Sequence, residues 1–168
     1  MIVPCFVDAN VFVYAHNPAE VLKRAVAGDL LRRLWADFSG RTSVQALNEF
    51  YTVVTRKLSA PMAQDEAWAE VEEFLRWNPL RIDGALMQRA RQIEARFRLD
   101  WWDCLIVAAA QQQDCSILYT EDLQHGAVFD GVKVCNPFIS QVQDEPAAYR
   151  VEAVSRHRPR GRPRKSAA

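Results

Sequence analysis

Near the N-terminus the chain reads Phe6-Val7-Asp8-Ala9-Asn10, in which an apolar run ends on a carboxylate. Residues 2–7 predict a short buried strand, and a second apolar run begins at Val11. Asp8 therefore lies close to the interior, where an isolated charge is costly and needs a cap, a cation or a metal. Ligands in open α/β sheets gather at the carboxyl ends of strands, which is where Asp8 falls. On this stretch alone the simpler interpretation is favoured, that Asp8 or Asn10 caps the next helix.

Short apolar runs alternate with longer segments of helical periodicity along most of the chain. This alternation predicts an α/β fold with a parallel sheet flanked by helices. The expected strands are residues 2–7, 41–43, 116–119 and 132–134, and the expected helices are 20–38, 44–57, 61–77, 83–98 and an apolar helix through 105–110.

Size and composition indicate one ordinary globular domain. The chain has 168 residues, 49% of them hydrophobic and 25% charged, which is enough for a substantial core. No run approaches the roughly 20 apolar residues of a membrane span, and the N-terminus lacks a signal-peptide pattern. Four scattered cysteines predict reduced core thiols, so we expect a cytoplasmic protein without a membrane partner.

Four acids stand at positions where α/β folds place functional groups. Asp8 and Asp122 follow predicted strands, Glu49 lies within a predicted helix, and Asp103 falls in the first turn of the apolar helix. A parallel sheet can bring all four to one edge. Together they would repel one another unless a cation joined them. Hard oxygen ligands without a His or Cys cluster favour Mg²⁺ or Mn²⁺, which can activate water against a phosphodiester.

Each acid also has a local interpretation that needs no metal. Asp103 can complete a cap with Asp100, and acids are favoured in the first turn of a helix. Asp122 can cap the turn at residues 124–126, and Glu49 can pair with Arg56 or face water.

The order and spacing of four segments make the chain resemble PIN-domain nucleases, with a size and layout similar to VapC-type toxins of toxin–antitoxin pairs. The segments cover roughly residues 2–138. They are Val7-Asp8-Ala9-Asn10, Ser43-Val44-Gln45-Ala46-Leu47-Asn48-Glu49-Phe50, Trp102-Asp103-Cys104-Leu105-Ile106-Val107-Ala108-Ala109-Ala110 and Leu118-Tyr119-Thr120-Glu121-Asp122-Leu123.

The resemblance implies a three-layer α/β/α domain over residues 1–140 and a metal-dependent endoribonuclease. RNA would be cut by water to leave a 5′-phosphate and a 3′-hydroxyl. A cognate antitoxin and a homodimer are implied as partners. The implied acidic quartet has Asp8 and Asp103 nearest the Mg²⁺ or Mn²⁺ and Glu49 and Asp122 completing its shell, with Asn10 and Thr120 in support.

Two polar surfaces accompany the quartet. Glu49 shares one helical face with Gln45, Thr52 and Arg56, at spacings of four, three and four residues. A second surface, rich in arginine, predicts either a solvated face or a phosphate-contacting one. Its members are Arg81, Arg89, Arg91, Arg96 and Arg98.

The C-terminal residues 141–168 predict a linker and a disordered basic tail. All 21 acidic residues precede residue 155, whereas six basic residues follow it. The run Pro159-Arg160-Gly161-Arg162-Pro163 resembles an AT-hook, whose glycine and arginines enter the narrow minor groove of AT-rich DNA. Nonspecific binding of RNA or DNA is the alternative. The residues expected to contact nucleic acid are Arg158, Arg160, Gly161, Arg162, Arg164 and Lys165.

Three functions remain open from the sequence. The leading hypothesis is an endoribonuclease toxin, and the intact quartet supports it. The tail suggests an alternative, a nucleoid-associated nuclease tethered to DNA and acting on it. A catalytically idle nucleic-acid-binding module is the third hypothesis.

Overall fold

A five-stranded sheet forms the centre of the computed structural model, which describes residues 2–139. The strands are β1 (Cys5–Val7), β2 (Gly40–Arg41), β3 (Ile117–Tyr119), β4 (Val128–Phe129) and β5 (Val132–Cys135). The helices are α1 (Ala9–Ala15), α2 (Val21–Ala36), α3 (Val44–Arg56), α4 (Gln64–Leu75), α5 (Gly84–Phe97) and α6 (Trp101–Gln112).

The strand order is β2-β1-β3-β5-β4, and every neighbouring pair is parallel except β4 with β5. This confirms the predicted parallel α/β sheet. β4 was not predicted, because two residues are too few to show periodicity. It forms a hairpin with β5 through Asp130-Gly131, both of which have positive φ, at 47° and 95°. An Asp-Gly pair is the strongest short sequence signal for such a turn.

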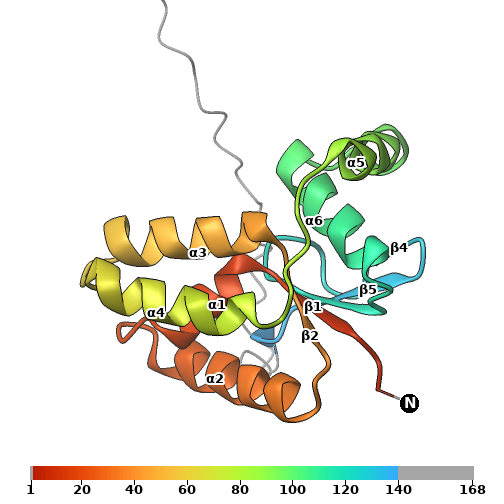
Figure 1. The fold of residues 1–168 in the computed structure, drawn as a ribbon. Coiled ribbons are helices and arrows are strands. Elements are labelled where there is room, and N and C mark those ends of the chain that lie inside the picture. The colour runs from red at the N-terminus through yellow and green to blue at the C-terminus, as the bar shows by residue number, and fades with distance from the viewer. Residues whose placement is uncertain (1, 140–168) are drawn as a thin grey trace, which may run out of the picture.

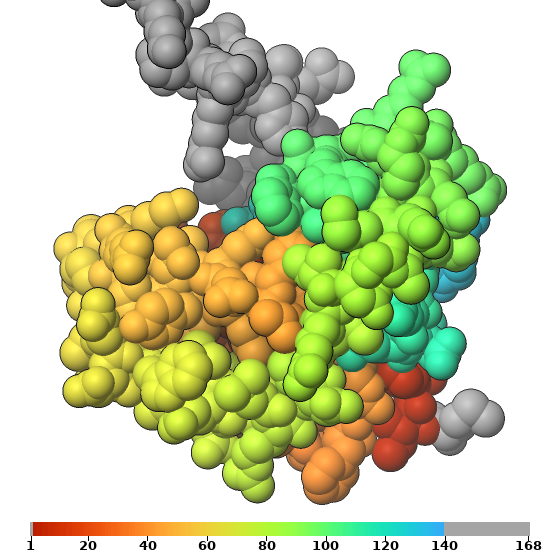
Figure 2. All heavy atoms as spheres, turned by 45° about the horizontal axis from the view of Figure 1, so that its top comes forward, coloured from red at the N-terminus to blue at the C-terminus, as the bar shows by residue number. Residues whose placement is uncertain are grey.

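Helices cover both faces of the sheet, as Figure 1 shows, with α5 and α6 on one side and α1 to α4 on the other. Side chains alternate along the strands to serve both layers. Phe6 and Leu118 pack into the core with α5 and α6, whereas Val7 and Tyr119 pack against the other helices. In Figure 2 the orange and yellow surface of α3 adjoins the green surface of the segments that follow α4. The expected three-layer α/β/α arrangement is therefore confirmed.

Short polar side chains set where most helices begin. Ser43, Asp83 and Asp100 each accept a hydrogen bond from a backbone N–H of the helix that follows, at α3, α5 and α6. The prediction that α4 begins near Pro61 was wrong. The backbone N–H of Met62 donates to the Val54 carbonyl of α3 at 2.8 Å, and Ala63 is extended, so the helix begins only at Gln64.

Two predicted apolar stripes were partly wrong. The apolar periodicity of residues 61–77 predicts an inward stripe of Trp68, Val71, Phe74 and Leu75, but the buried positions are Ala67, Val71 and Phe74, and Trp68 and Leu75 are exposed. The spacing of four and then three residues defines the true stripe. The periodicity of residues 20–38 likewise places Val21, Leu22 and Phe38 on the inward face, but all three are exposed, because they lie in the first turn of α2 or beyond its end.

The remaining predictions concern cysteines, membranes and the tail. All four cysteines are free, and three are buried, as expected for core thiols. Among residues 2–139 no helix has the length and apolarity to cross a bilayer. The tail, with Arg158, Arg160, Gly161, Arg162, Arg164 and Lys165, lies outside the described residues, and the domain boundary at residue 140 stays a prediction.

Substitution of Gly40 tests the packing of β2. A Cβ at this position would lie 2.4 Å from the Trp77 ring, which is itself wedged among Phe12, Trp35 and Phe74. We expect Gly40→Ala to lower the free energy of unfolding by about 1–3 kcal/mol. Urea denaturation measures this.

Gly28→Ala is the matched control for Gly40→Ala. Its Cβ would meet only the Arg32 side chain at 3.6 Å, within α2. Alanine is the better helix former, so this variant should be neutral or more stable by up to about 1 kcal/mol. Equal denaturation midpoints for the two variants would contradict the contact between β2 and Trp77.

Candidate active site

Asp8 lies at the carboxyl end of β1, beside the end of β3. Its backbone N–H donates to the Tyr119 carbonyl at 3.1 Å, which continues the parallel β1–β3 pairing. This register places the Asp8 side chain next to Thr120. Asp8 is only 5% exposed, so its carboxylate lies within the protein at the sheet edge where α/β folds bind ligands.

Thr120 joins three groups of the site through one hydroxyl. Its Oγ1 accepts hydrogen bonds from the Asn10 side-chain amide at 3.0 Å and from the Asp122 backbone N–H at 3.1 Å. A threonine hydroxyl has two acceptor positions and one proton. Since both acceptor positions are occupied, the proton is donated to Asp8 Oδ2, 2.8 Å away.

Asn10 links α1 to the loop that follows β3. Its amide also donates to Asp122 Oδ2 at 3.0 Å, and its Oδ1 accepts from the Glu121 backbone N–H at 3.4 Å. The supporting roles predicted for Asn10 and Thr120 have a physical basis in these bonds. Together they hold Asp122 in place relative to Asp8.

Three of the four predicted acids lie in one region. The pKa of Asp8 is raised to about 7, chiefly by burial, with smaller contributions from the charges of Asp122 and Glu49, and the Thr120 and Ala9 hydrogen bonds oppose the rise. Burial of its carboxyl also raises the pKa of Glu49, as does Asp122, whereas a Gln45 hydrogen bond and the Lys57 charge lower it. Asn10, Glu49 and Asp122 line one pocket of about 350 Å³.

Asp103 lies in the first turn of α6, as predicted. The adjacent Trp102 carbonyl accepts a hydrogen bond from Gln45 Nε2 at 3.2 Å. Gln45 is one turn before Glu49 on α3, so the first turn of α6 borders the helix that carries Glu49. The participation of Asp103 with the other acids stays a prediction.

The capping and ion-pair interpretations, which need no metal, hold for some of these acids and not for others. Asp8 does cap α1 through the Ala9 N–H, while also accepting from Thr120. Asp100 caps α6. Among the described residues, Glu49 forms no ion pair with Arg56, and the Asp122 carboxylate accepts from Asn10 instead of capping the next turn.

The chemistry of these carboxylates fits a hard divalent cation, although the described side chains do not form a complete coordination shell. Carboxylate oxygens are the ligands that Mg²⁺ and Mn²⁺ prefer, and a nearby cation would offset the cost of the buried Asp8 charge. Among residues 2–139, no three His, Cys, Asp or Glu side chains are grouped closely enough to hold an ion as they stand.

Sequence reasoning missed a second network beside the site. Glu121 accepts hydrogen bonds from the Tyr14 hydroxyl at 2.6 Å and from Lys23 Nζ at 2.9 Å. These contacts tie the loop after β3 to α1 and α2. Glu121 is next to Asp122 in the sequence, and no spacing or motif distinguishes its role from that of a surface acid.

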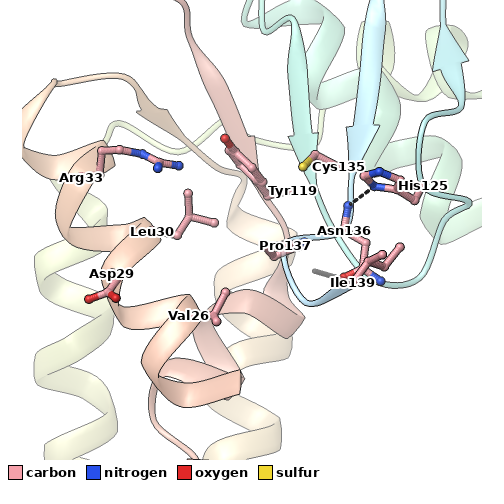
Figure 3. A pocket seen from close by; sticks show the side chains of 10 residues that line it. All are labelled: Val26, Asp29, Leu30, Arg33, Tyr119, His125, Cys135, Asn136, Pro137 and Ile139. Atoms are coloured by element: carbon pink, nitrogen blue, oxygen red, sulfur yellow. Dashed lines mark hydrogen bonds between the residues drawn. The ribbon is translucent and has the colours of Figure 1, made fainter. Parts of the chain in front are cut away.

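A different pocket, of about 500 Å³, lies between α2 and the ends of β3 and β5 (Figure 3). His125 borders it and accepts a hydrogen bond from the Asn136 backbone N–H at 3.1 Å. Asp29, its one acid, pairs with Arg32. None of the predicted site residues lines this pocket, so it is separate from the acidic site.

Comparison with known proteins agrees with this geometry. The PIN-domain family profile matches residues 5–128, and the chain therefore belongs to the PIN-domain family. Among solved structures, the chain is similar to VapC20 of Mycobacterium tuberculosis, a toxin that cleaves the sarcin–ricin loop. The two share 19% identity and a TM-score of 0.51, over 70% of this chain and 89% of VapC20, which supports a common fold. A search of curated proteins finds no match.

The raised pKa of Asp8 predicts a pH dependence of stability in the absence of divalent cations. The folded protein holds the Asp8 proton more tightly than the unfolded chain, whose value is near 3.8. The stabilising contribution is therefore complete below pH 3.8 and is lost as pH rises through about 7. Asp8→Asn should abolish this loss, which is at most about 1.4 kcal/mol per pH unit.

Urea denaturation of both proteins in EDTA, from pH 4 to pH 8, measures the difference. Asp114→Asn is the control, because Asp114 is exposed and its left-handed backbone, with φ of 54°, suits asparagine. That variant retains Asp8 and hence the wild-type dependence. A constant difference between wild type and Asp8→Asn would contradict the burial of a titrating carboxyl.

Proposed function

We propose that the protein is a Mg²⁺- or Mn²⁺-dependent endoribonuclease, acting as the toxin of a toxin–antitoxin pair. One observation carries the proposal: at the carboxyl edge of the sheet Asp8 and Asp122 are joined through Thr120 and Asn10, and Glu49 lines the same pocket as Asn10 and Asp122. Clustered like charges are destabilising in the absence of a cation, so their retention at one edge favours a metal-dependent reaction. Membership of the PIN-domain family supports the nuclease class.

Asp8 and Asp103 would hold the metal most directly, and Glu49 and Asp122 would complete its surroundings, partly through water. A divalent ion bound there supplies a water of lowered pKa and a counter-charge for phosphate. The protein's own contribution is orientation. Thr120 directs one oxygen of Asp8, and Asn10 directs one oxygen of Asp122, so each carboxylate keeps a defined position.

Glu49 is the side chain best suited to accept a proton from the attacking water. Its carboxylate reaches solvent, lines the pocket with Asp122, and has a raised pKa caused by burial and by the Asp122 charge. A carboxylate with a raised pKa is a stronger base than an ordinary surface acid. RNA as the substrate, an antitoxin partner and a homodimer belong to the same proposal, supported by the fold shared with a VapC toxin.

Substitution of Asp103 tests the reaction and the predicted quartet together. Wild type should cleave RNA in Mg²⁺ or Mn²⁺ and lose cleavage in EDTA. Asp103→Asn should lose at least about 100-fold of the rate, as expected when one group of a charge-stabilising set is removed. Gel assays on RNA and on single- and double-stranded DNA measure this, with Asp114→Asn as the control at wild-type rate.

The alternatives give different results in these assays. Preferential cleavage of DNA would favour the DNA-tethered nuclease, and binding without cleavage of any substrate would favour the idle module. Cleavage of RNA that survives both EDTA and Asp103→Asn would overturn the metal mechanism.

Metal binding can be measured apart from cleavage. At pH 8, where Asp8 is ionised, ~10 mM Mg²⁺ should raise the melting temperature of the wild type. With a dissociation constant of ~1 mM the stabilisation is about 1.4 kcal/mol, or roughly 3–6 °C. Asp8→Asn should lose most of this shift, and Asp114→Asn should keep it. Equal shifts for all three proteins would remove Asp8 from the metal site.

A further inference from the structure

A large pocket lies beside the acidic site and has no assigned role. Its volume is about 760 Å³, and its walls come from α3, from the segment after α4 and from the start of α6. Figure 2 shows the surface of α3 next to the green surface of the segments that follow α4. Glu49 and Val53 line this groove and also the pocket of Asn10 and Asp122, so the two are neighbours that share a wall.

We propose that this groove binds an unpaired nucleotide of a single-stranded RNA, with its base stacked on Trp102 and its phosphates held by Lys57 and Arg81. The proposal rests on the proposed function, because it names the part of the substrate that lies next to the cleaved bond. It assigns to Trp102, Lys57 and Arg81 roles in binding and positioning.

Trp102 is exposed at the start of a helix whose middle is buried. It is 58% exposed, whereas the residues from Cys104 to Ala110 are all buried. Its backbone is held on both sides, since its N–H donates to Asp100 at 3.0 Å and its carbonyl accepts from Gln45 at 3.2 Å. An exposed indole on a fixed backbone offers a flat surface for a base, and stacking of this kind is tolerant of sequence.

Two cations of the groove are available to phosphate. Lys57 and Arg81 are both exposed, and neither forms an ion pair with a carboxylate of residues 2–139. Several other surface cations are paired with acids: Lys23, Arg32, Arg76, Arg91 and Arg96. Lysine and arginine side chains are the usual phosphate contacts of nucleic-acid sites.

The remaining walls suit a single strand better than a duplex or a helical peptide. Asn48 and Thr52 offer an amide and a hydroxyl between Trp102 and Lys57, and these can bond to the edge of an unstacked base. Paired bases in a duplex are stacked on each other and unavailable to an indole. An amphipathic helix docks its apolar face in a hydrophobic groove, whereas six of the ten residues that line this groove are polar or charged, beside Val44, Val53, Ile82 and Trp102.

Binding in EDTA separates this inference from catalysis. A fluorescently labelled octamer of single-stranded RNA is titrated with wild type, Trp102→Leu, Trp102→Phe and Phe38→Ala, with anisotropy as the readout. Trp102→Leu should weaken binding about 5- to 100-fold, and Trp102→Phe should recover part of the loss. Phe38 is 80% exposed just after α2 and does not line the groove, so Phe38→Ala should stay within about twofold of wild type.

Stacking itself has a separate readout. An octamer containing 2-aminopurine should lose fluorescence on binding wild type or Trp102→Phe and keep it with Trp102→Leu.

The salt dependence of the binding constant measures how many phosphates the protein contacts. Lys57→Gln and Arg81→Gln should each reduce the slope by about 0.7, the value for one contact on a single strand. Arg32→Gln, at a cation paired with Asp29, should leave the slope unchanged.

Unchanged affinity of Trp102→Leu, unchanged salt slopes, or duplex RNA binding as tightly as the single strand would overturn this inference. A helical peptide that binds wild type but not Trp102→Leu, without competition from RNA, would overturn it in favour of a protein partner. Trp102-dependent RNA binding by a protein that cleaves no nucleic acid would overturn the proposed function and leave this inference standing.

Discussion

The hydrogen bond from the Thr120 hydroxyl to Asp8 Oδ2 is the contact on which the site depends. It joins residues 112 positions apart and lies where two parallel strands end side by side. The same hydroxyl accepts from Asn10 and from the Asp122 backbone, so one buried oxygen fixes both a carboxylate and the loop that carries another. A buried charge is tolerated only when it is bonded in this way, and here the bonds also set its direction.

Asp8 serves folding and the site at once. Its Oδ1 caps α1 and its Oδ2 faces Thr120, so the two interpretations that compete in the sequence are both true of one side chain. The cap favours the helix, whereas burial works against the ionised form and raises the pKa of the carboxyl. A residue retained for stability alone would not need to be an acid here, since asparagine or serine also caps a helix.

Sequence reasoning succeeded where a local rule acts alone. Ser43 and Asp83 begin helices at the predicted residues, and the alternation of strands and helices gave the parallel sheet. It failed where long-range packing decides, as at the exposed Trp68 and at the late start of α4, which Met62 ties to α3. Asp8 and Asp122 were predicted from their positions after strands, but the Glu121–Lys23 network was not predicted, because it joins residues 98 positions apart. The Asp130-Gly131 turn was visible in the sequence and was overlooked.

The order of the strands has a consequence for synthesis of the protein. β1 lies inside the sheet between β2 and β3, yet β3 follows it by more than a hundred residues. Closing so long a loop is entropically costly and slow, and it cannot begin before the ribosome has released Tyr119 and Thr120. For most of its translation, the nascent chain therefore contains Asp8 and Glu49 but lacks Thr120 and Asp122, which complete the site. The candidate active site of this proposed ribonuclease therefore cannot assemble until almost the whole described domain has been synthesised.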